Sequence, residues 1–272
     1  MKGRQIRESL HNGRRIYSTC VTALSPRVPE FLRQAKVDFA FIDTEHTPLG
    51  REALSWMCQT YSAMGIPPVV RIPSPDPIEA TKAIDGGAGG IIGPYIETAE
   101  QVQALIGAVR WRPLKGRRLQ EALRNPATVE PELRSYLESR NQDILLILNI
   151  ESVPAIENLD ALLATPGVDA VLIGPHDLSC SLGLPEQYRH ARFEEAVQTV
   201  FRKARESHVG AGFHFWEDIE REVSWAQSGA NLIIHSADIT FIRNNLKRDL
   251  DRIRETLGDN PPSDDAGGSA IV

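Results

Sequence analysis

Short apolar runs alternate with longer amphipathic segments along nearly the whole chain, and this alternation limits the possible folds more than any other feature. Each apolar run resembles a strand that is buried on both faces of a parallel sheet. The expected strands are residues 16–22, 39–43, 68–72, 90–94, 144–150, 170–174, 209–213 and 231–235. Eight strands that alternate with helices over about 240 residues predict a (β/α)8 barrel. A doubly wound open sheet is the alternative, but it usually contains fewer strands.

The segments between and after these strands differ in character. Residues 99–109 and 239–257 repeat apolar side chains at helical spacing, which predicts two amphipathic helices. Residues 110–128 are rich in Arg, Pro and Gly, and we expect them to form a functional or interface loop. Residues 258–272 contain Pro, Gly and Asp without a basic residue, which predicts a disordered tail after a single barrel domain of residues 1–257.

Composition excludes several classes of partner. With 30 Lys and Arg against 36 Asp and Glu, the net charge of -6 disfavours a nucleic-acid-binding protein, which needs a basic face. No apolar run approaches the roughly 20 residues of a membrane-spanning helix, and the basic N-terminus lacks the apolar core of a secretory signal. The three cysteines are scattered without a Cys-x-x-Cys pair, so we expect no disulfide framework and a cytoplasmic protein.

Polar residues stand at the ends of four expected strands. Asp43 and His46 follow the second strand, Arg71 ends the third, Glu151 follows the fifth, and residues 174–177 follow the sixth. Because the carboxyl ends of barrel strands meet at one mouth, we expect these side chains to surround one active site. Glu151 and Asp177 supply two carboxylates that suit Mg²⁺ or Mn²⁺, with water and substrate as the other ligands. The alternative is that each acid caps a helix.

The other strand ends suggest an acid–base pair and a cation. An aspartate that orients a neutral imidazole improves it as a proton acceptor, so Asp43 and His46 form a candidate pair; a surface turn is the alternative. Arg71 can bind a carboxylate or stabilise an enolate oxygen, unless it forms a structural ion pair.

Several further residues are weaker candidates. We interpret the glycine-rich residues 86–90 as a helix C-cap and turn. His214 and His235 are expected to face the mouth, more often as structural histidines than as ligands, and Cys180 lacks an adjacent base in the sequence.

The motifs at these strand ends resemble the class II pyruvate aldolases of the HpcH/HpaI family, with similar spacing from about residue 10 to 255. They are Phe-Ile-Asp-Thr-Glu-His at 41–46, Val-Val-Arg-Ile-Pro at 69–73, Ile-Glu-Ser at 150–152 and Ile-Gly-Pro-His-Asp-Leu-Ser at 173–179. The resemblance implies a (β/α)8 barrel, commonly a hexamer in which the last helix is exchanged between subunits. It implies cleavage or formation of a carbon–carbon bond between a small 2-oxo acid and an aldehyde.

The resemblance also implies roles for individual residues. Glu151 and Asp177 match the metal ligands for Mg²⁺, Mn²⁺ or Co²⁺, His46 matches the base, and Asp43 matches the partner of that base. Arg71 matches the arginine that binds the pyruvyl group. The remaining matches are Asp85, an acid offered to a neighbouring subunit, and Gly174, Pro175 and His176, which contact the bound keto acid.

Four positions depart from the family pattern, and we expect them to shape the aldehyde pocket. They are Tyr95, residues 117–120, Asn149 and His176. Two alternative functions follow. The same enolate can arise by decarboxylation of oxaloacetate, as in relatives that resemble macrophomate synthase. A non-catalytic barrel that binds keto acids is the other alternative. The presence of Asp43 and His46 counts against it, because a protein that only binds keto acids would not need them.

Overall fold

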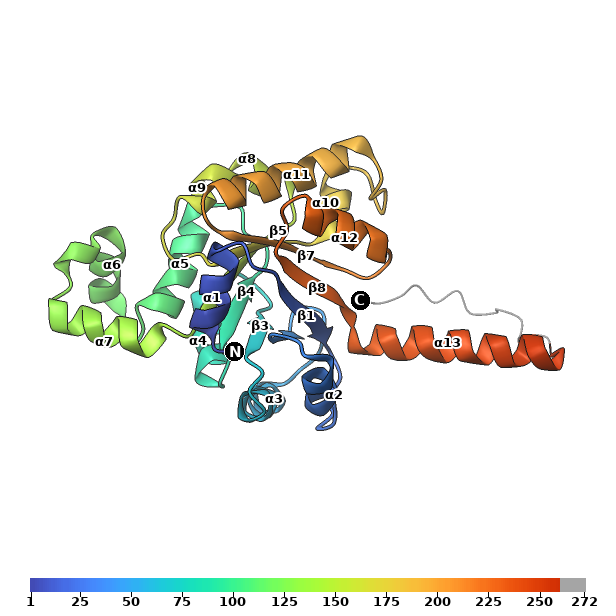
Figure 1. The fold of residues 1–272 in the computed structure, drawn as a ribbon. Coiled ribbons are helices and arrows are strands. Elements are labelled where there is room, and N and C mark those ends of the chain that lie inside the picture. Colours follow the sequence, from blue (N-terminus) through green and yellow to red (C-terminus); the bar gives the residue numbers. More distant parts are fainter. Residues whose placement is uncertain (260–272) are drawn as a thin grey trace.

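Eight parallel strands form a closed barrel in which each strand pairs with its neighbour in the sequence (Figure 1). The structure is a computed structural model, and it describes residues 1–259. The strands are β1 Ile16–Val21, β2 Ala40–Asp43, β3 Pro68–Arg71, β4 Gly90–Gly93, β5 Leu145–Ile150, β6 Ala170–Ile173, β7 Gly210–Phe215 and β8 Leu232–Ala237. The predicted (β/α)8 barrel is therefore confirmed.

Helices surround this barrel and close one of its ends (Figure 1). They are α1 Gly3–His11, α2 Val28–Ala35, α3 Arg51–Ala63, α4 Pro77–Asp85, α5 Ala99–Arg110, α6 Gly116–Arg124, η1 Pro126–Thr128, α7 Pro131–Asn141, α8 Val153–Glu157, α9 Leu159–Leu163, α10 Pro175–Ser181, α11 Ala191–Glu206, α12 Ile219–Gln227 and α13 Asp238–Leu257. Ile6 and Leu10 of α1 are fully buried in one cluster with inward-facing strand residues such as Leu145. Helix α1 thus seals the amino end of the barrel and leaves the carboxyl end for a site.

Residues 110–128 do not form the expected loop. After a short turn the chain forms helix α6 and then the 3-10 turn η1, and α6 and α7 project from the side of the barrel (Figure 1). Leu119 and Leu123 approach the position of a Cβ at Gly107 of α5 to within 3.5 Å. Ala122 packs with Val129 and Leu137 in a small cluster of its own. The apolar side chains at helical spacing outweigh the polar composition on which the expectation of a loop was based.

Helix α13 confirms the second predicted amphipathic helix and projects away from the barrel (Figure 1). Thr240 is its one buried residue. Its apolar side chains are exposed at Ile239, Phe241, Ile242, Leu246, Leu250, Ile253 and Leu257. Gly258, with a φ of 76°, ends the helix; apart from this residue and Asp259, the predicted disordered tail lies outside the described residues.

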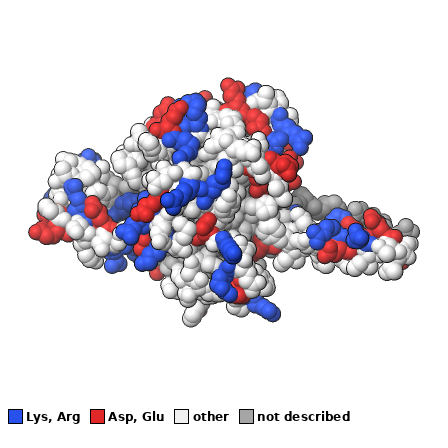
Figure 2. Space-filling view, in the orientation of Figure 1, with Lys and Arg blue, Asp and Glu red and all other residues white. Residues whose placement is uncertain are grey.

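Surface charge and helix hydropathy are ordinary over the described chain. On the face seen in Figure 2, basic and acidic side chains are interspersed rather than gathered into one basic patch. Between residues 1 and 259, no helix combines the length and the apolar character needed to span a membrane.

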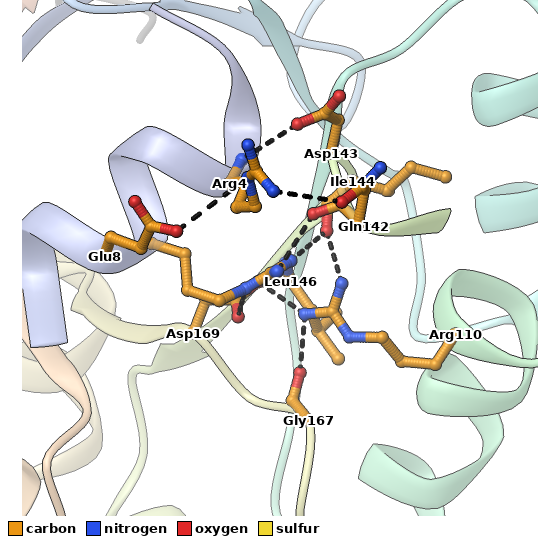
Figure 3. Close-up of polar contacts among 10 residues, drawn as sticks. Arg4, Glu8, Arg110, Gln142, Asp143, Ile144, Leu146, Gly167 and Asp169 are labelled. Atoms are coloured by element: carbon orange, nitrogen blue, oxygen red, sulfur yellow. Dashed lines mark hydrogen bonds and ion pairs between the residues drawn. The ribbon is translucent and has the colours of Figure 1, made fainter. Parts of the chain in front are cut away.

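A buried ion-pair cluster ties the amino end of the barrel together (Figure 3). Asp169, which directly precedes β6, accepts hydrogen bonds from Arg7 Nε at 2.5 Å and from Arg110 Nη2 at 2.6 Å. It also accepts a hydrogen bond from the backbone N–H of Leu146 at 2.7 Å. Both guanidinium groups donate to the carbonyl of Ile144 as well. This one carboxylate therefore links α1, α5, β5 and β6 at the end opposite the mouth. Residues at that end of a (β/α)8 barrel generally contribute to stability rather than to catalysis.

Replacing Asp169 is expected to destabilise the fold strongly. Asp169→Asn leaves two largely buried guanidinium groups without their counter-charge, which should lower the free energy of unfolding by about 3 kcal/mol. Denaturant unfolding measures the change. Asp160→Asn, which removes an exposed ion pair with Lys203, is the control and should cost under about 1 kcal/mol. Equal losses in the two variants would contradict the role assigned to the cluster.

Candidate active site

A cavity of about 560 Å³ opens at the carboxyl end of the barrel. It is lined by Phe41, His46, Arg71, Asn149, Leu172, Ile173, Gly174, Pro175, His176, Asp177, Glu186, Tyr188, His214, Trp216 and Glu217. The lining includes six of the nine residues that the sequence analysis assigned to the site. Asp43 and Glu151 lie directly beside the lining residues Arg71 and Asn149, and Asp85 lies elsewhere.

Two carboxylates converge next to Gly174. The register pairs Ile150 of β5 with Ile173 of β6, so the next residues, Glu151 and Gly174, emerge side by side at the mouth. A Cβ placed on Gly174 would lie 3.2 Å from Oε2 of Glu151 and 3.3 Å from Oδ2 of Asp177. Any larger residue at position 174 would press against both carboxylates. Glycine therefore keeps the space between the two acids open.

The peptide N–H of Tyr95 and the side chain of Asn149 hold Glu151 in place. Oε1 of Glu151 accepts a hydrogen bond from the backbone N–H of Tyr95 at 2.7 Å, and Oε2 accepts one from Nδ2 of Asn149 at 2.9 Å. Tyr95 adopts a φ of 53°, a left-handed conformation that costs a non-glycine residue roughly 1 kcal/mol or more. The strained backbone points the N–H of Tyr95 at the carboxylate.

The electrostatics of this pair favour a cation. Burial raises the pKa of Glu151 to about 7, against the hydrogen bond from Tyr95, and the negative charges of Asp177 and Glu45 raise it further. Within residues 1–259 neither Glu151 nor Asp177 forms an ion pair with a basic side chain. Oδ1 of Asn149 is also buried without a hydrogen-bond partner in this part of the chain. Buried negative charge without a counter-charge is costly unless a cation binds.

The donor set suits a hard divalent cation. No group of three or more His, Cys, Asp and Glu side chains is arranged for a metal in the described chain, so Glu151 and Asp177 stand as a pair. Two carboxylate oxygens are what Mg²⁺ and Mn²⁺ commonly take from a protein, with water and substrate at the remaining positions. The residues present therefore fit such an ion.

Arg71 is held by two acids beside this pair. Its Nε and Nη2 donate to the two oxygens of Asp43 at 2.9 and 2.8 Å, and Nε lies 3.1 Å from Oε2 of Glu45. Burial would raise the pKa of Asp43, but the hydrogen bonds and charge of Arg71 outweigh it and lower that pKa. Among the described residues Nη1 of Arg71 has no hydrogen-bond partner. The guanidinium is thus rigid and still has N–H groups for an anionic ligand.

The expected hydrogen bond between Asp43 and His46 is absent from the described structure. Asp43 is buried at the end of β2, where its oxygens are taken by Arg71 and by the backbone N–H of Glu45 at 3.0 Å. His46 lies three residues further on in the turn, with its Nε2 3.7 Å from Oε2 of Glu45. Asp43 therefore positions Arg71, and Glu45 is the acid nearest the imidazole.

Glu45 is the residue that sequence reasoning missed. Its side chain is 7% exposed although it belongs to a turn at the mouth. Its carboxylate raises the pKa of the Tyr95 hydroxyl to about 12, so Glu45 acts on Arg71, His46 and Tyr95 together. The signal was available, because an acid stands between Asp43 and His46 in the motif at 41–46.

Two of the four departures from the family pattern reach the cavity. Asn149 and His176 line it, whereas Tyr95 acts through Glu151 and Glu45 outside the lining. Residues 117–120 lie on helix α6, away from the mouth, and Arg117 is almost fully exposed. Within a single subunit, therefore, the expectation that all four positions shape the aldehyde pocket is wrong.

Asp85 is not brought to the mouth of its own barrel. It ends helix α4, which runs from the mouth towards the opposite end, and its carboxylate pairs with Arg112. Gly86 caps this helix and Gly87 turns with a φ of 109°, as predicted for the glycine-rich segment. Contribution of Asp85 to a neighbouring subunit stays a prediction.

The two late histidines take opposite faces of the barrel. The register pairs His214 with the inward-facing Ile234, and His214 lines the cavity with Nε2 3.1 Å from the carbonyl of Ser236. His235 pairs with the outward-facing Phe215 and binds Glu222 of α12 at 2.8 Å. The expectation that His235 faces the mouth is wrong, because adjacent residues of a strand alternate faces.

Cys180 also differs from the expectation. Its Sγ lies 4.0 Å from Nε2 of His176, one helical turn earlier on α10, so the thiol does have a neighbouring imidazole. Helical spacing of four residues brings the two together.

Comparison with known proteins agrees with this geometry. The sequence model of the HpcH/HpaI aldolase/citrate lyase family matches residues 21–244. The chain belongs to this family. It is 30% identical over 240 residues to a hydroxypyruvate/pyruvate aldolase of Sagittula stellata, covering 88% of this chain and 93% of the relative. It is 29% identical to a 2-keto-3-deoxy-L-rhamnonate aldolase of Klebsiella pneumoniae, covering 85% of each.

A solved structure supports the same family assignment. The HpcH/HpaI aldolase of Desulfitobacterium hafniense DCB-2 superposes with a TM-score of 0.81 at 26% identity, covering 94% of this chain and 99% of that one. This family member is accordingly an enzyme, a carbon–carbon lyase of the aldolase type.

The buried His214 should make the stability of this aldolase pH-dependent. Burial lowers the pKa of His214 from 6.5 to about 4, so the folded state resists the proton that the unfolded state binds below pH 6.5. The free energy of unfolding should therefore fall by roughly 3 kcal/mol between pH 7 and pH 4 on account of this group.

Denaturant unfolding at several pH values tests this expectation. His214→Asn should show a correspondingly shallower pH dependence than the wild type, and the exposed His208→Asn should not. A variant at position 214 with the same pH dependence as the wild type would contradict the assignment.

Proposed function

We propose that this family member is a divalent-metal-dependent aldolase that joins or separates a 2-oxo acid and an aldehyde. The observation that carries the proposal is the convergence of Glu151 and Asp177 beside Gly174, without a basic partner in the described chain, next to Arg71 and His46 of the same cavity. Such an arrangement has a place for a cation, an anion-binding group and a proton acceptor within one space.

Glu151 and Asp177 would hold the ion, which we propose to be Mg²⁺ or Mn²⁺, with Co²⁺ as a further candidate. A bound divalent cation supplies Lewis-acid polarisation of the carbonyl group of a 2-oxo acid. Gly174 keeps the space between the two acids free for ion and substrate, and the backbone N–H of Tyr95 fixes the orientation of Glu151.

Arg71 is proposed to bind the substrate through the N–H groups that Asp43 does not use. A guanidinium prefers planar anions such as a carboxylate or an enolate oxygen. Since Asp43 and Glu45 already fix its position, little conformational entropy is lost when the substrate binds. The backbone of Gly174, Pro175 and His176, which lines the same cavity, is proposed to contact the keto acid.

His46 is proposed to move the proton. In cleavage the imidazole takes the proton of the 4-hydroxyl group, the C4–O bond becomes a carbonyl, and the C3–C4 bond breaks with its electron pair left on the 2-oxo acid as an enolate. In synthesis the enolate adds to the aldehyde and His46 returns the proton. The side chain of His46 is 39% exposed and lines the cavity, so a substrate can reach it.

The projecting helix α13 supports a homo-oligomer. Its apolar row is largely exposed in the described structure, with Phe241 alone forming a ring contact, 5.5 Å from His235. Tyr17 of β1 and Leu24 after it are also exposed on the barrel. We propose that α13 is exchanged between subunits of a hexamer, in which Asp85 is offered to a neighbouring site. Three free cysteines are in keeping with a cytoplasmic location.

Proton exchange in D2O, followed by NMR, tests the proposed chemistry. The wild type should exchange the methyl protons of pyruvate when Mg²⁺ or Mn²⁺ is present and stop when EDTA is added. Arg71→Lys keeps the charge but loses the bidentate geometry, and should slow exchange by about tenfold or more. His46→Ala should lower aldol turnover by about 10²-fold or more without loss of metal binding.

The contradicting results are distinct. Exchange that survives EDTA unchanged would contradict metal dependence, and unchanged turnover in His46→Ala would contradict the proposed base. Loss of CO2 from oxaloacetate, without pyruvate exchange, would favour the decarboxylating synthase instead.

A further inference from the structure

The outer half of the cavity differs in chemistry from the half that holds Arg71 and Asn149. We define this outer rim as His176, Glu186, Tyr188, Trp216 and Glu217, which come from α10 and from the loops before α11 and α12. The rim holds two carboxylates, two aromatic rings and an imidazole, but no lysine or arginine.

The negative charge of the rim is not neutralised by basic side chains. Within residues 1–259, the one ion-pair partner of Glu186 is His176, with Nδ1 3.9 Å away, and Glu217 forms no ion pair. Arg71 is the one lysine or arginine in the described cavity lining, and Asp43 already binds it. Arg189 and Arg221 lie in the adjoining groove, but their ion pairs are with other acids, Asp218 and Glu194.

Buried polar groups hold Glu186 at the rim. Its φ is 59°, and its backbone N–H donates to Oγ of Ser179 at 3.1 Å. Ser179 is fully buried and its hydroxyl donates to the carbonyl of His176 at 2.7 Å. The loop that carries Glu186 is therefore fastened to helix α10, which also carries Asp177.

The two aromatic side chains of the rim are held in place by packing against other rings. Tyr188 is buried and packs edge-to-face on Phe215 with ring centroids 5.1 Å apart, and Trp216 lies 5.5 Å from the ring of His214. Asn149 lies at the floor of the same cavity and is 1% exposed. Its Oδ1 has no hydrogen-bond partner among residues 1–259.

We propose that Glu186 and Glu217 determine which aldehyde the enzyme accepts, by selecting an uncharged, hydroxylated aldehyde and excluding carboxylated or phosphorylated ones. Carboxylates accept hydrogen bonds from hydroxyl groups and repel anions, and aromatic faces pack against the C–H groups of a polyol. This inference rests on the proposed aldolase function and assigns the acceptor, which that function leaves open.

A matched pair of acceptors tests the proposal on the intact protein. Pyruvate and the metal are combined with D-glyceraldehyde or with D-glyceraldehyde 3-phosphate, and kcat/KM is measured for each. The wild type should favour the uncharged aldehyde by about tenfold or more. Glu186→Gln combined with Glu217→Gln should reduce that ratio by about tenfold, mainly through a lower KM for the phosphorylated aldehyde.

Two controls separate charge at the rim from general effects. Glu195→Gln removes one carboxylate from an exposed position on α11 outside the cavity and should leave the ratio unchanged. Raising the salt concentration screens exposed charges, so it should narrow the ratio of the wild type and have little effect on the double variant.

The outcomes distinguish this inference from the proposed function. A wild type that exchanges pyruvate protons but prefers the phosphorylated aldehyde overturns the assignment of the rim alone. The same holds if the double variant keeps the wild-type ratio, or if neither aldehyde reacts although exchange occurs. Absence of metal-dependent pyruvate exchange overturns the proposed function, and this inference with it.

Discussion

Two acids that lie close together without a counter-charge are the constraint around which the mouth of this barrel is organised. The pairing of Ile150 with Ile173 places Glu151 beside Gly174, and a helix that begins one residue later brings Asp177 to the same point. Burial and the negative charge of Asp177 raise the pKa of Glu151 and so favour its protonated form. A bound divalent cation would remove the cost of this buried negative charge, which is why we propose that this pair of acids binds a metal.

The neighbouring features depend on this pair. Tyr95 takes a strained backbone conformation at the end of β4 and so gives Glu151 a hydrogen-bond donor. Arg71 is set between Asp43 and Glu45 rather than against Glu151, so Glu151 and Asp177 have no basic partner in the described chain. At the opposite end of the barrel, Asp169 is fully matched with Arg7 and Arg110. Stability and function are thus separated along the barrel axis, as is usual for this architecture.

Much of the fold could be predicted from the sequence because buried parallel strands are nearly continuous apolar runs. The strand β6 and its neighbours could be recognised from such runs. Polar residues that directly follow these strands must then lie at one mouth of the barrel. Helix α6 was missed because basic residues and flanking Gly and Pro masked the spacing of Leu119, Ala122 and Leu123. Such a helix is stabilised by tertiary packing that composition does not reveal.

The contacts between site residues were harder to predict from the sequence than which residues belong to the site. Asp43 and His46 are close in sequence, yet Asp43 points into the barrel and meets Arg71 of the next strand. His235 was misplaced because the exact register of β8, extended by two residues beyond the expected end, decides which face it takes. Asp85 lies at the end of a helix and forms an ion pair with Arg112. Because Arg112 is distant in sequence, this pairing could not be predicted from local spacing.

Direct titration with Mn²⁺, by electron paramagnetic resonance or calorimetry, tests the central claim without reference to any substrate. The account predicts one Mn²⁺ per chain and affinity lowered by about tenfold or more in Glu151→Gln and in Asp177→Asn. Glu195→Gln, which removes an acid elsewhere, should bind as the wild type does. Wild-type affinity in both variants at the mouth would contradict the assignment of Glu151 and Asp177 as the metal-binding pair.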